Sequence, residues 1–260
     1  MKPRTAYNKE EFHRLFYERN MELTRSRLRE SVKEDTLIIH AINNMTDIEV
    51  TANTLIKDLR EWYEIYATEV SRGITEHKKF VESISKNSRE ELMNSMGIRR
   101  EDSVGADLRE MDIVPIINLA NHIRGIYRLM EDEENYIDKL MRGYCPNLRE
   151  VAGTVIGAIL IRHAGSLKSL MEMPSSKIQL LGAEKALFRH MKSGTKPPKF
   201  GIIFGHPLIQ KSPRQKQGKI ARTIAGKICI AVRVDYFKGE FIGDKLSRVL
   251  ADKFNSCKND

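Results

Sequence analysis

Hydrophobic side chains recur along residues 38–66 at intervals that alternate between three and four. A second run with the same alternation covers residues 113–141, and only Glu134 interrupts its apolar character. An average spacing of about 3.5 residues keeps one stripe of a helix facing a partner helix, which is the pattern of a coiled coil. The pattern therefore predicts two long helices that pair through a narrow seam. The seam positions are Ile38, Ala41, Met45, Ile48, Ala52, Leu55, Leu59, Trp62 and Tyr66 in the first helix and Ile113, Ile116, Ala120, Ile123, Tyr127, Met130, Glu134, Ile137 and Met141 in the second.

Residues 73–111 separate the two runs and contain three glycines and several polar stretches. Glycine and clustered polar residues typically mark turns, so this segment is expected to form an irregular tip. Two helices of similar length joined by such a tip fold back most simply into an antiparallel pair that projects from a globular body. A compact helical bundle is the alternative. The charged flanks of both runs favour the projecting arm, which we expect over residues 35–142.

The segments on either side of this arm are predicted to be helical as well. Residues 1–34 have loosely helical apolar spacing among many charges, which predicts a short lead-in helix that cannot form a core alone. Residues 143–260 begin with a nearly all-apolar stretch, which predicts the core of a C-terminal globular domain. Helices are expected over 222–231 and 243–254, with a strand over the β-branched run 228–234 as an alternative. The expected fold class is all-α.

Positive charge is concentrated in one part of the chain. The protein has 260 residues and a net charge of +9, from 44 Lys and Arg against 35 Asp and Glu. Residues 185–234 contain twelve Lys and Arg and no acidic residue, so this window accounts for the whole positive balance. Basic runs are often only solvated surface, but cations without acidic neighbours repel each other until the rest of the protein or a polyanion relieves the repulsion. Phosphate backbone is the commonest cellular polyanion, so we expect a nucleic-acid-binding surface.

Cysteine usage and hydropathy exclude several other classes of protein. Cys145, Cys229 and Cys257 are odd in number, widely spaced and outside any Cys-x-x-Cys pair, which argues against a disulfide framework and a zinc site. No run approaches the ~20 apolar residues of a membrane span, and the N-terminus lacks the apolar core of a secretory signal. We therefore expect an intracellular protein without a metal site or a membrane partner.

A short motif of small residues, Gly182-Ala183, comes just before the acid-free window and opens a strong helix-forming run that reaches His190. A helix N-terminus offers unpaired N–H groups and the positive end of the helix dipole, and small residues let a nucleic-acid backbone approach closely. The motif thus predicts a seat for phosphate. A simple turn at Gly182 explains the same residues equally well.

Two cationic segments follow this motif. Residues 192–201 form a loop in which two prolines restrict the backbone and three lysines supply charge. Phe200, Phe204 and His206 are candidates for stacking on unpaired RNA bases, and His206 is the one most expected to be exposed, because the phenylalanines suit a core. Residues 211–222 mix cations with glutamines, which contact phosphates, sugar hydroxyls and base edges.

Three stretches together resemble the signature of the Nop domain, which marks scaffold proteins of box C/D ribonucleoproteins and a related pre-mRNA splicing factor. They are Gly182-Ala183-Glu184-Lys185-Ala186-Leu187-Phe188-Arg189, Pro198-Lys199-Phe200-Gly201-Ile202-Ile203-Phe204 and Lys216-Gln217-Gly218-Lys219-Ile220-Ala221-Arg222. The resemblance extends over about residues 32–255 and includes the predicted coiled-coil pair. The sequence has no nucleophile elbow, Gly-rich phosphate loop or His-x-x-x-His pair, which predicts a chain without catalytic activity of its own.

The resemblance implies a subunit that recognises kink-turn box C/D guide RNA together with a small ribosomal-protein-like partner. It also implies self-association through the coiled coil and recruitment of fibrillarin, a 2′-O-methyltransferase that brings S-adenosylmethionine, so that this chain needs no cofactor itself. The motifs and the basic window together give the residues expected to face RNA or the small partner: Gly182, Ala183, Glu184, Lys185, Arg189, His190, Lys196, Lys199, His206, Lys211, Arg214, Lys216, Lys219 and Arg222.

Members of this family usually carry a large N-terminal domain that holds fibrillarin, whereas only residues 1–34 precede the coiled coil here. Phe12, Leu15 and Phe16 are therefore the expected remnant of a fibrillarin-facing surface, with a fragment or a divergent N-terminus as the alternative. The lysine-rich tail of nuclear relatives is absent, which favours an archaeal-type cytoplasmic scaffold over a nucleolar one. Two other functions stay open: a splicing-type assembly factor, and a coiled-coil dimer that binds nucleic acid without selectivity.

Overall fold

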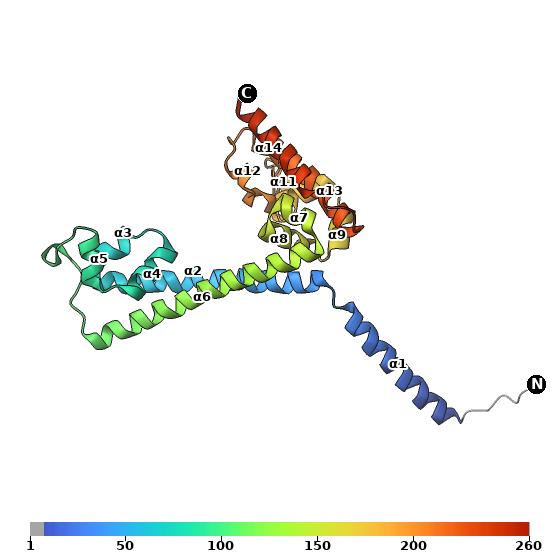
Figure 1. Cartoon of the computed structure of the whole chain (residues 1–260), viewed down its shortest axis with the longest axis horizontal. Helices are drawn as coiled ribbons and strands as arrows, with labels where there is room; N and C mark the ends of the chain where they lie inside the picture. Colours follow the sequence, from blue (N-terminus) through green and yellow to red (C-terminus); the bar gives the residue numbers. More distant parts are fainter. Residues whose placement is uncertain (1–7, 260) are drawn as a thin grey trace, which may run out of the picture.

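A computed structural model describes residues 8–259, and within that range the chain forms helices and no β-strand. The predicted all-α class is confirmed. Figure 1 shows a lead-in helix, a long two-helix arm and a globular body at one end of the arm. The helices are α1 Lys9–Ser31, α2 Glu34–Tyr66, α3 Thr68–Gly73, α4 His77–Lys86, α5 Arg89–Ser95, η1 Arg100–Asp102, α6 Glu110–Tyr144, α7 Pro146–Ala152, α8 Thr154–Ala164, α9 Leu167–Glu172, α10 Ser175–Leu180, α11 Glu184–Ser193, η2 Ile202–Gly205, α12 Pro207–Gln210, α13 Gln217–Tyr236 and α14 Gly243–Asn259.

The two long helices of the arm, α2 and α6, run antiparallel, as the seam pattern predicted (Figure 1). Most of the predicted seam is buried or half-buried between them, and Glu134, the one polar seam position, is exposed. The side-chain amide of Asn44 on α2 also donates to Glu133 on α6 at 2.9 Å. The fully buried seam residues are Ile38, Ala41, Ala52, Leu59, Ile116, Ala120, Ile123, Ile137 and Met141, and Ile48, Leu55, Tyr127 and Met130 are half-buried.

One part of the predicted seam is wrong. Trp62 is 41 % exposed, whereas Ile56 and Tyr63, one position away from the predicted Leu55 and Trp62, are buried. An α-helix repeats every 3.6 residues, so an apolar stripe drifts around it unless a partner helix follows by supercoiling. The stripe on α2 drifts towards the short helix α4, whose Phe80 ring lies 5.5 Å from the Tyr63 ring in an edge-to-face contact.

The tip of the arm, residues 67–109, is folded rather than irregular and contains helices α3, α4 and α5 (Figure 1). Its core consists of apolar side chains from α4 and α5 packed against the outer half of α2 and α6. Arg60 holds one side of the tip by donating to the carbonyls of Ser71 and Ile74 at 2.6 and 2.7 Å. The buried guanidinium of Arg89 holds the other side by donating to the Gly105 carbonyl at 3.0 Å.

The body is all-helical, and α13 crosses its centre. The β-branched run that left a strand as an alternative is helical, because α13 continues to Tyr236. A single apolar core joins the body to the base of the arm, since Ile38, Ile137 and Met141 belong to the same cluster of buried residues as Leu160 and Ile224. The arm and the body are therefore a rigid unit where they meet.

No helix in the described range is long and apolar enough to cross a membrane.

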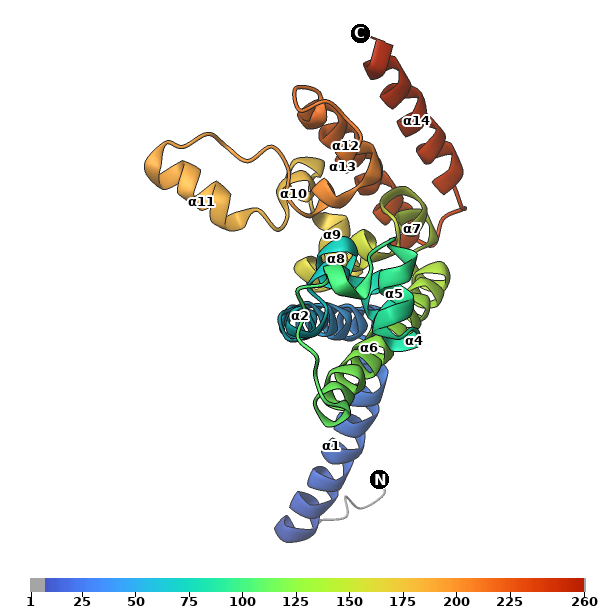
Figure 2. The same ribbon diagram turned by 90° about the vertical axis from the view of Figure 1, so that its left-hand side faces the viewer.

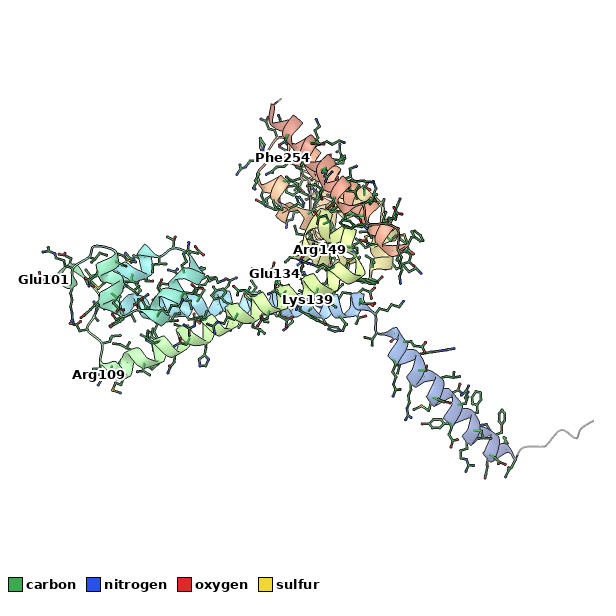
Figure 3. The ribbon with its side chains drawn as sticks, viewed as in Figure 1. Glu101, Arg109, Glu134, Lys139, Arg149 and Phe254 are labelled. Atoms are coloured by element: carbon green, nitrogen blue, oxygen red, sulfur yellow. The ribbon has the colours of Figure 1, made fainter. Side chains whose placement is uncertain are left out.

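Asp138 of α6 ties the arm to the body at this junction. Its carboxylate accepts hydrogen bonds from Arg149 at 2.6 Å, Thr154 at 2.5 Å and Arg142 at 2.7 Å. Arg149 appears at the junction in Figure 3. The hydrogen bond from Arg149, followed by that from Thr154, lowers the pKa of Asp138 to about 2.

We expect the contribution of Asp138 to stability to disappear in acid. A carboxylate whose pKa is lowered on folding stabilises the protein above its unfolded pKa and loses that effect as the pH falls to its folded pKa. The free energy of unfolding of an Asp138→Asn variant should therefore be about 2 kcal/mol below wild type at pH 7, and the difference should shrink between about pH 4 and pH 2. Urea unfolding across this range measures the difference. Asp132→Asn, on the exposed face of α6, serves as control, and a difference for Asp138→Asn that stays constant down to pH 2 would contradict the account.

The lead-in helix α1 is present as predicted, but it buries none of its residues. It leaves the arm at its junction with the body and projects away from both (Figure 1). Phe12, Leu15 and Phe16 are 54, 45 and 59 % exposed, and the two phenylalanine rings stack with their centroids 6.0 Å apart. This helix thus presents an apolar face that the described chain does not cover.

Candidate nucleic-acid interface

The segment 182–200 leaves the body and returns to it at nearly the same place. At the point of return, the Gly201 N–H donates to the Gln179 carbonyl at 2.9 Å, and the Ile202 N–H donates to the Leu181 carbonyl at 2.8 Å. Between these ends, α11 reaches out from the body (Figure 2), and none of its residues is buried. The predicted helix of the Gly182 motif is thus a projecting element on a narrow base.

Gly201 is required at this base because there is no room for a side chain. A Cβ atom at Gly201 would lie 1.9 Å from the Leu181 carbonyl oxygen, which is a backbone atom and has no freedom to move aside. We expect Gly201→Ala to cost about 1–3 kcal/mol of unfolding free energy, because overpacking forces backbone shifts. Gly226→Ala is the matched control, because a Cβ at Gly226 in the middle of α13 meets nothing within 4 Å.

The Gly226→Ala control should leave the free energy of unfolding unchanged or raise it by about 0.5–1 kcal/mol, since alanine is more favourable than glycine inside a helix. Thermal unfolding of both variants measures the contrast. Equal melting temperatures for the two alanine variants would show that the close approach at Gly201 is not a constraint.

Cationic side chains cover the projecting helix and its return loop. Lys185 and Arg189 lie on α11 and are exposed, as are Lys196 and Lys199 in the loop. Lys185, Arg189 and Lys199 make no ion pair with any residue in the described range. The loop is held in place from the body, because the Gln179 side-chain amide donates to the Lys199 carbonyl at 2.7 Å.

The second cationic segment lies beside the first. Lys199 and the start of α13 are neighbours, because a Cβ atom at Gly218 would lie 3.8 Å from the Lys199 side chain. Lys211, Arg214, Lys219 and Arg222 are exposed around this position, and Lys216 is half-buried. The structure therefore brings Lys199 of the loop beside the start of α13. We use the name body cationic surface for the cations of α11, its return loop and the segment 211–222 taken together: Lys185, Arg189, Lys196, Lys199, Lys211, Arg214, Lys216, Lys219 and Arg222.

The expected phosphate seat at the start of α11 is partly filled by the protein itself. The carboxylate of Glu184 accepts the Gly182 N–H at 2.7 Å, and this hydrogen bond is the main cause of a lowered pKa for Glu184. Gly182 has a φ of +85°, so glycine is needed there for the turn. Ala183 caps α11 without a side-chain hydrogen bond. The Gly182 amide is therefore not free for phosphate in this conformation.

The two histidines of the prediction have different positions. His190, at the end of α11, is half-buried, and its Nδ1 contacts the Thr195 carbonyl, which closes the turn at Gly194. His206 was expected to be exposed, and the structure corrects this, because only 9 % of it is accessible. Its Nε2 donates to the Val151 carbonyl at 3.1 Å, and its Nδ1 accepts the Leu208 N–H at 3.2 Å.

His206 is thus a structural link between α7 and α12 and not a stacking platform. Burial lowers its pKa, so the neutral ring that makes both hydrogen bonds is favoured. The sequence did not show this because a histidine before a proline also suits an exposed turn.

Aromatic and apolar side chains accompany the cations. The rings of Phe200 and Phe204 stack with their centroids 4.7 Å apart, and Phe204 is 41 % exposed. Two residues of α11 that sequence reasoning did not single out are more open still, Phe188 at 66 % and Met191 at 76 %. Their spacing of three residues places them on one side of the helix, which is the signal that the sequence offered. An apolar strip beside cations suits a surface shared by RNA and a protein.

Comparisons with known proteins agree with this architecture. Residues 44–256 match the model of the Nop family, described as "snoRNA binding domain, fibrillarin". The chain is 36 % identical over 254 residues to a NOP5 family protein of Methanocaldococcus jannaschii, covering 92 % of this chain and 61 % of that protein. It is 36 % identical over 222 residues to nucleolar protein 58 of Lodderomyces elongisporus, covering 80 % of this chain and 43 % of that protein.

A solved structure also resembles the chain. The crystal structure of a fibrillarin/Nop5p complex contains a chain that matches with a TM-score of 0.55 and 22 % identity, covering 98 % of this chain and 86 % of that one. At this identity the likeness concerns the fold. The chain spans between about two fifths and three fifths of the length of the two curated relatives above.

Proposed function

The chain belongs to the Nop family, and from this premise we propose that it is a scaffold subunit of a box C/D ribonucleoprotein. In this proposal its body binds kink-turn guide RNA together with a small ribosomal-protein-like partner. The observation that carries the proposal is the body cationic surface, whose exposed Lys and Arg come from a window without acidic residues. Such a surface suits phosphate contacts, which position a nucleic acid on a protein.

The projecting helix α11 supports composite recognition. Its exposed cations suit contacts with a phosphate backbone, whereas the exposed apolar side chains of Phe188 and Met191 suit contacts with a protein partner. A helix that stands clear of the body contacts two neighbours at once, the RNA and the protein already bound to it. Affinity for naked duplex RNA is then weaker than affinity for the preassembled complex, because the apolar side chains of α11 have no partner on a naked duplex.

The methyltransferase part of the proposal concerns α1. We propose that Phe12, Leu15 and Phe16 contribute to a fibrillarin-facing surface and that fibrillarin supplies both S-adenosylmethionine and the catalysis of 2′-O-methylation. The chain itself then acts without a cofactor and without catalysis. One relative in these comparisons is archaeal and another is nucleolar by name, so we propose a cytoplasmic scaffold in an archaeal cell and a nucleolar one in a eukaryote.

Self-association through the arm completes the proposal. The outward faces of α2 and α6 carry exposed apolar side chains, among them Val50, Trp62 and Tyr136. Burial of these side chains against a second arm provides the driving force for a dimer.

Binding of labelled RNA tests composite recognition. We expect the chain to bind a kink-turn RNA at least about tenfold more tightly when the small partner is present, which corresponds to roughly 1.4 kcal/mol of added contact. A plain duplex of the same length is the control. Equal affinity for the duplex, the free kink-turn and the preassembled complex would contradict the proposal and identify binding of nucleic acid without selectivity.

A pull-down with fibrillarin tests the other partner. We expect capture by the wild-type chain and loss of capture when Phe12 and Phe16 are both changed to Ala. Tyr17→Ala, also exposed on α1, is the control. Absence of capture by the wild-type chain would point to an assembly factor that works without the methyltransferase.

A further inference from the structure

A second cationic surface lies on the arm, in its outer half, where α4 packs along α6 (Figure 1). Side chains of the two helices surround a hollow of about 120 Å³ there. We call this hollow the arm groove, and it is lined by Lys78, Glu82 and Lys86 of α4 and Arg124, Tyr127, Arg128 and Glu131 of α6.

The arm groove has an excess of positive charge. Lys78 is in an ion pair with Glu131, so these two charges balance each other. No ion pair within residues 8–259 involves Lys86, Arg124 or Arg128, and one carboxylate remains to offset these three cations. The arm groove therefore attracts an anion even though the rest of the arm carries many acidic side chains.

The walls of the arm groove are fixed before any ligand binds. Phe80, Val81 and Ile84 on the opposite side of α4 are buried in the core of the tip. Arg60 braces the start of this helix, since its guanidinium lies 4.3 Å from the centre of the Phe80 ring and binds the carbonyls before it. The two helices that carry the cations are thus held in place relative to each other, so no backbone rearrangement is needed when an anion binds.

The size of the hollow limits what it accepts. At about 120 Å³ it is smaller than the ~300–1,000 Å³ of sites that enclose a whole small molecule. Single phosphate groups of a longer chain suit it better, because they enter one at a time while the remainder of the polymer stays outside. Arginine on one wall also suits this role, since its planar guanidinium binds phosphate oxygens in pairs.

We propose that the arm groove is a second RNA contact, which holds the phosphate backbone of a guide RNA at a distance from the body cationic surface. The inference rests on the proposed function of the body, because a short RNA held by the body does not extend to the outer arm. A long RNA that reaches both surfaces is bound more tightly than the body alone permits, since the second contact is intramolecular. The arm then sets the direction in which the RNA leaves the body.

RNA length separates this inference from the proposed function of the body. Fluorescence anisotropy with the full-length chain and the small partner compares two RNAs, a full-length box C/D guide RNA and a minimal kink-turn hairpin. For the guide RNA we expect Arg128→Glu to weaken binding by about three- to tenfold and to reduce the salt slope by about one. For the hairpin we expect no change.

Lys139→Glu is the matched control, because it makes the same charge change at an exposed position of α6 outside the groove (Figure 3). Arg128→Gln tests the loss of one cation without an added acid and should give a smaller effect in the same direction. Circular dichroism of each variant verifies that the arm is folded.

Two results overturn the inference. One is an equal effect of Arg128→Glu and Lys139→Glu on the guide RNA, and the other is unchanged RNA binding with altered self-association, which would assign the groove to an acidic protein segment. Failure of the proposed function is recognised separately, because the wild-type chain would then bind neither RNA in preference to duplex.

Discussion

Leu59→Asp is expected to lower the free energy of unfolding of the outer arm by about 3–5 kcal/mol, since it removes a buried leucine and puts a charge in its place. Leu59 is fully buried, in one cluster with Ile56, Tyr63, Ala120 and Ile123. The new carboxylate is therefore removed from water in an apolar core. Urea unfolding followed by circular dichroism measures the loss.

Trp62→Asp is the control for this prediction. The heptad pattern places Trp62 in the seam together with Leu59, but the side chain is 41 % exposed. We expect the Trp62 change to cost less than about 1 kcal/mol, because its charge stays in water. Similar losses for the two variants would contradict the observed seam and favour the predicted one.

RNA binding by the body should survive the Leu59 change. The core of the outer arm and the core of the body are separate clusters, and the base of the arm belongs to the second of them. Local unfolding of the outer arm therefore leaves the body intact. Loss of kink-turn binding in Leu59→Asp would show that the two cores fold as one.

The second large effect is expected for Asp235→Ala, at about 3–5 kcal/mol, because several buried donors lose their acceptor. Asp235 is 7 % exposed on α13, and its carboxylate accepts the N–H groups of Asn147 and Leu148 at 3.0 and 2.7 Å. It also accepts the side-chain amide of Asn147 at 2.7 Å, while the Asn147 oxygen accepts the Ile242 N–H at the same distance.

This network joins the start of α7 to α13 and to the loop before α14, so its loss should loosen the body rather than the arm. Asp235→Asn should cost less than Asp235→Ala, because the amide oxygen still accepts a hydrogen bond. Thermal unfolding gives both values, and hydrogen exchange locates the change. Equal and small losses, below about 1 kcal/mol, would mean that water replaces the carboxylate.

The arm was predictable from the sequence because a narrow apolar stripe with 3-4 spacing is typical of a helix that pairs with one other helix. The 3-4 spacing from Ile38 to Ala52 predicts both the helix and its buried face. Beyond Ala52 the prediction holds for Leu59 but fails at Trp62, because α4 covers α2 from a second side and Ile56 and Tyr63 are buried as well. No local pattern on α2 shows where a helix some twenty residues later will pack.

The folded tip was missed although the sequence held a signal for it. Ser88 and Glu91 form a capping box at the start of α5, with both reciprocal hydrogen bonds present. The Ser-x-x-Glu spacing is readable in the sequence as a helix start. Three glycines and the polar runs around them masked this signal, and the buried Arg89 shows that a polar residue there serves the fold.

The candidate site was predictable as charge but not as shape. A window without acidic residues implies a cationic surface, because burying positive charges that have no acidic partner costs too much free energy. That α11 projects, with Phe188 and Met191 uncovered, depends on the close approach at Gly201 and on hydrogen bonds between distant carbonyls and amides. These are tertiary features, and so is the hydrogen bond to Val151 that buries His206. The hydrogen bond from the Gly182 N–H to Glu184, in contrast, is local, because the two residues are two positions apart.

The central claim is that the body cationic surface captures a phosphate backbone presented by a protein–RNA complex. Anisotropy of the preassembled kink-turn RNA and small partner, titrated with a Lys185→Glu, Lys199→Glu double variant, tests it most directly. The control carries the same reversals at Arg25 and Arg29, which are exposed on α1. The account predicts binding about 100-fold weaker than wild type for the first variant, with a lower salt slope, and wild-type binding for the control. Equal affinities for the two variants would contradict it.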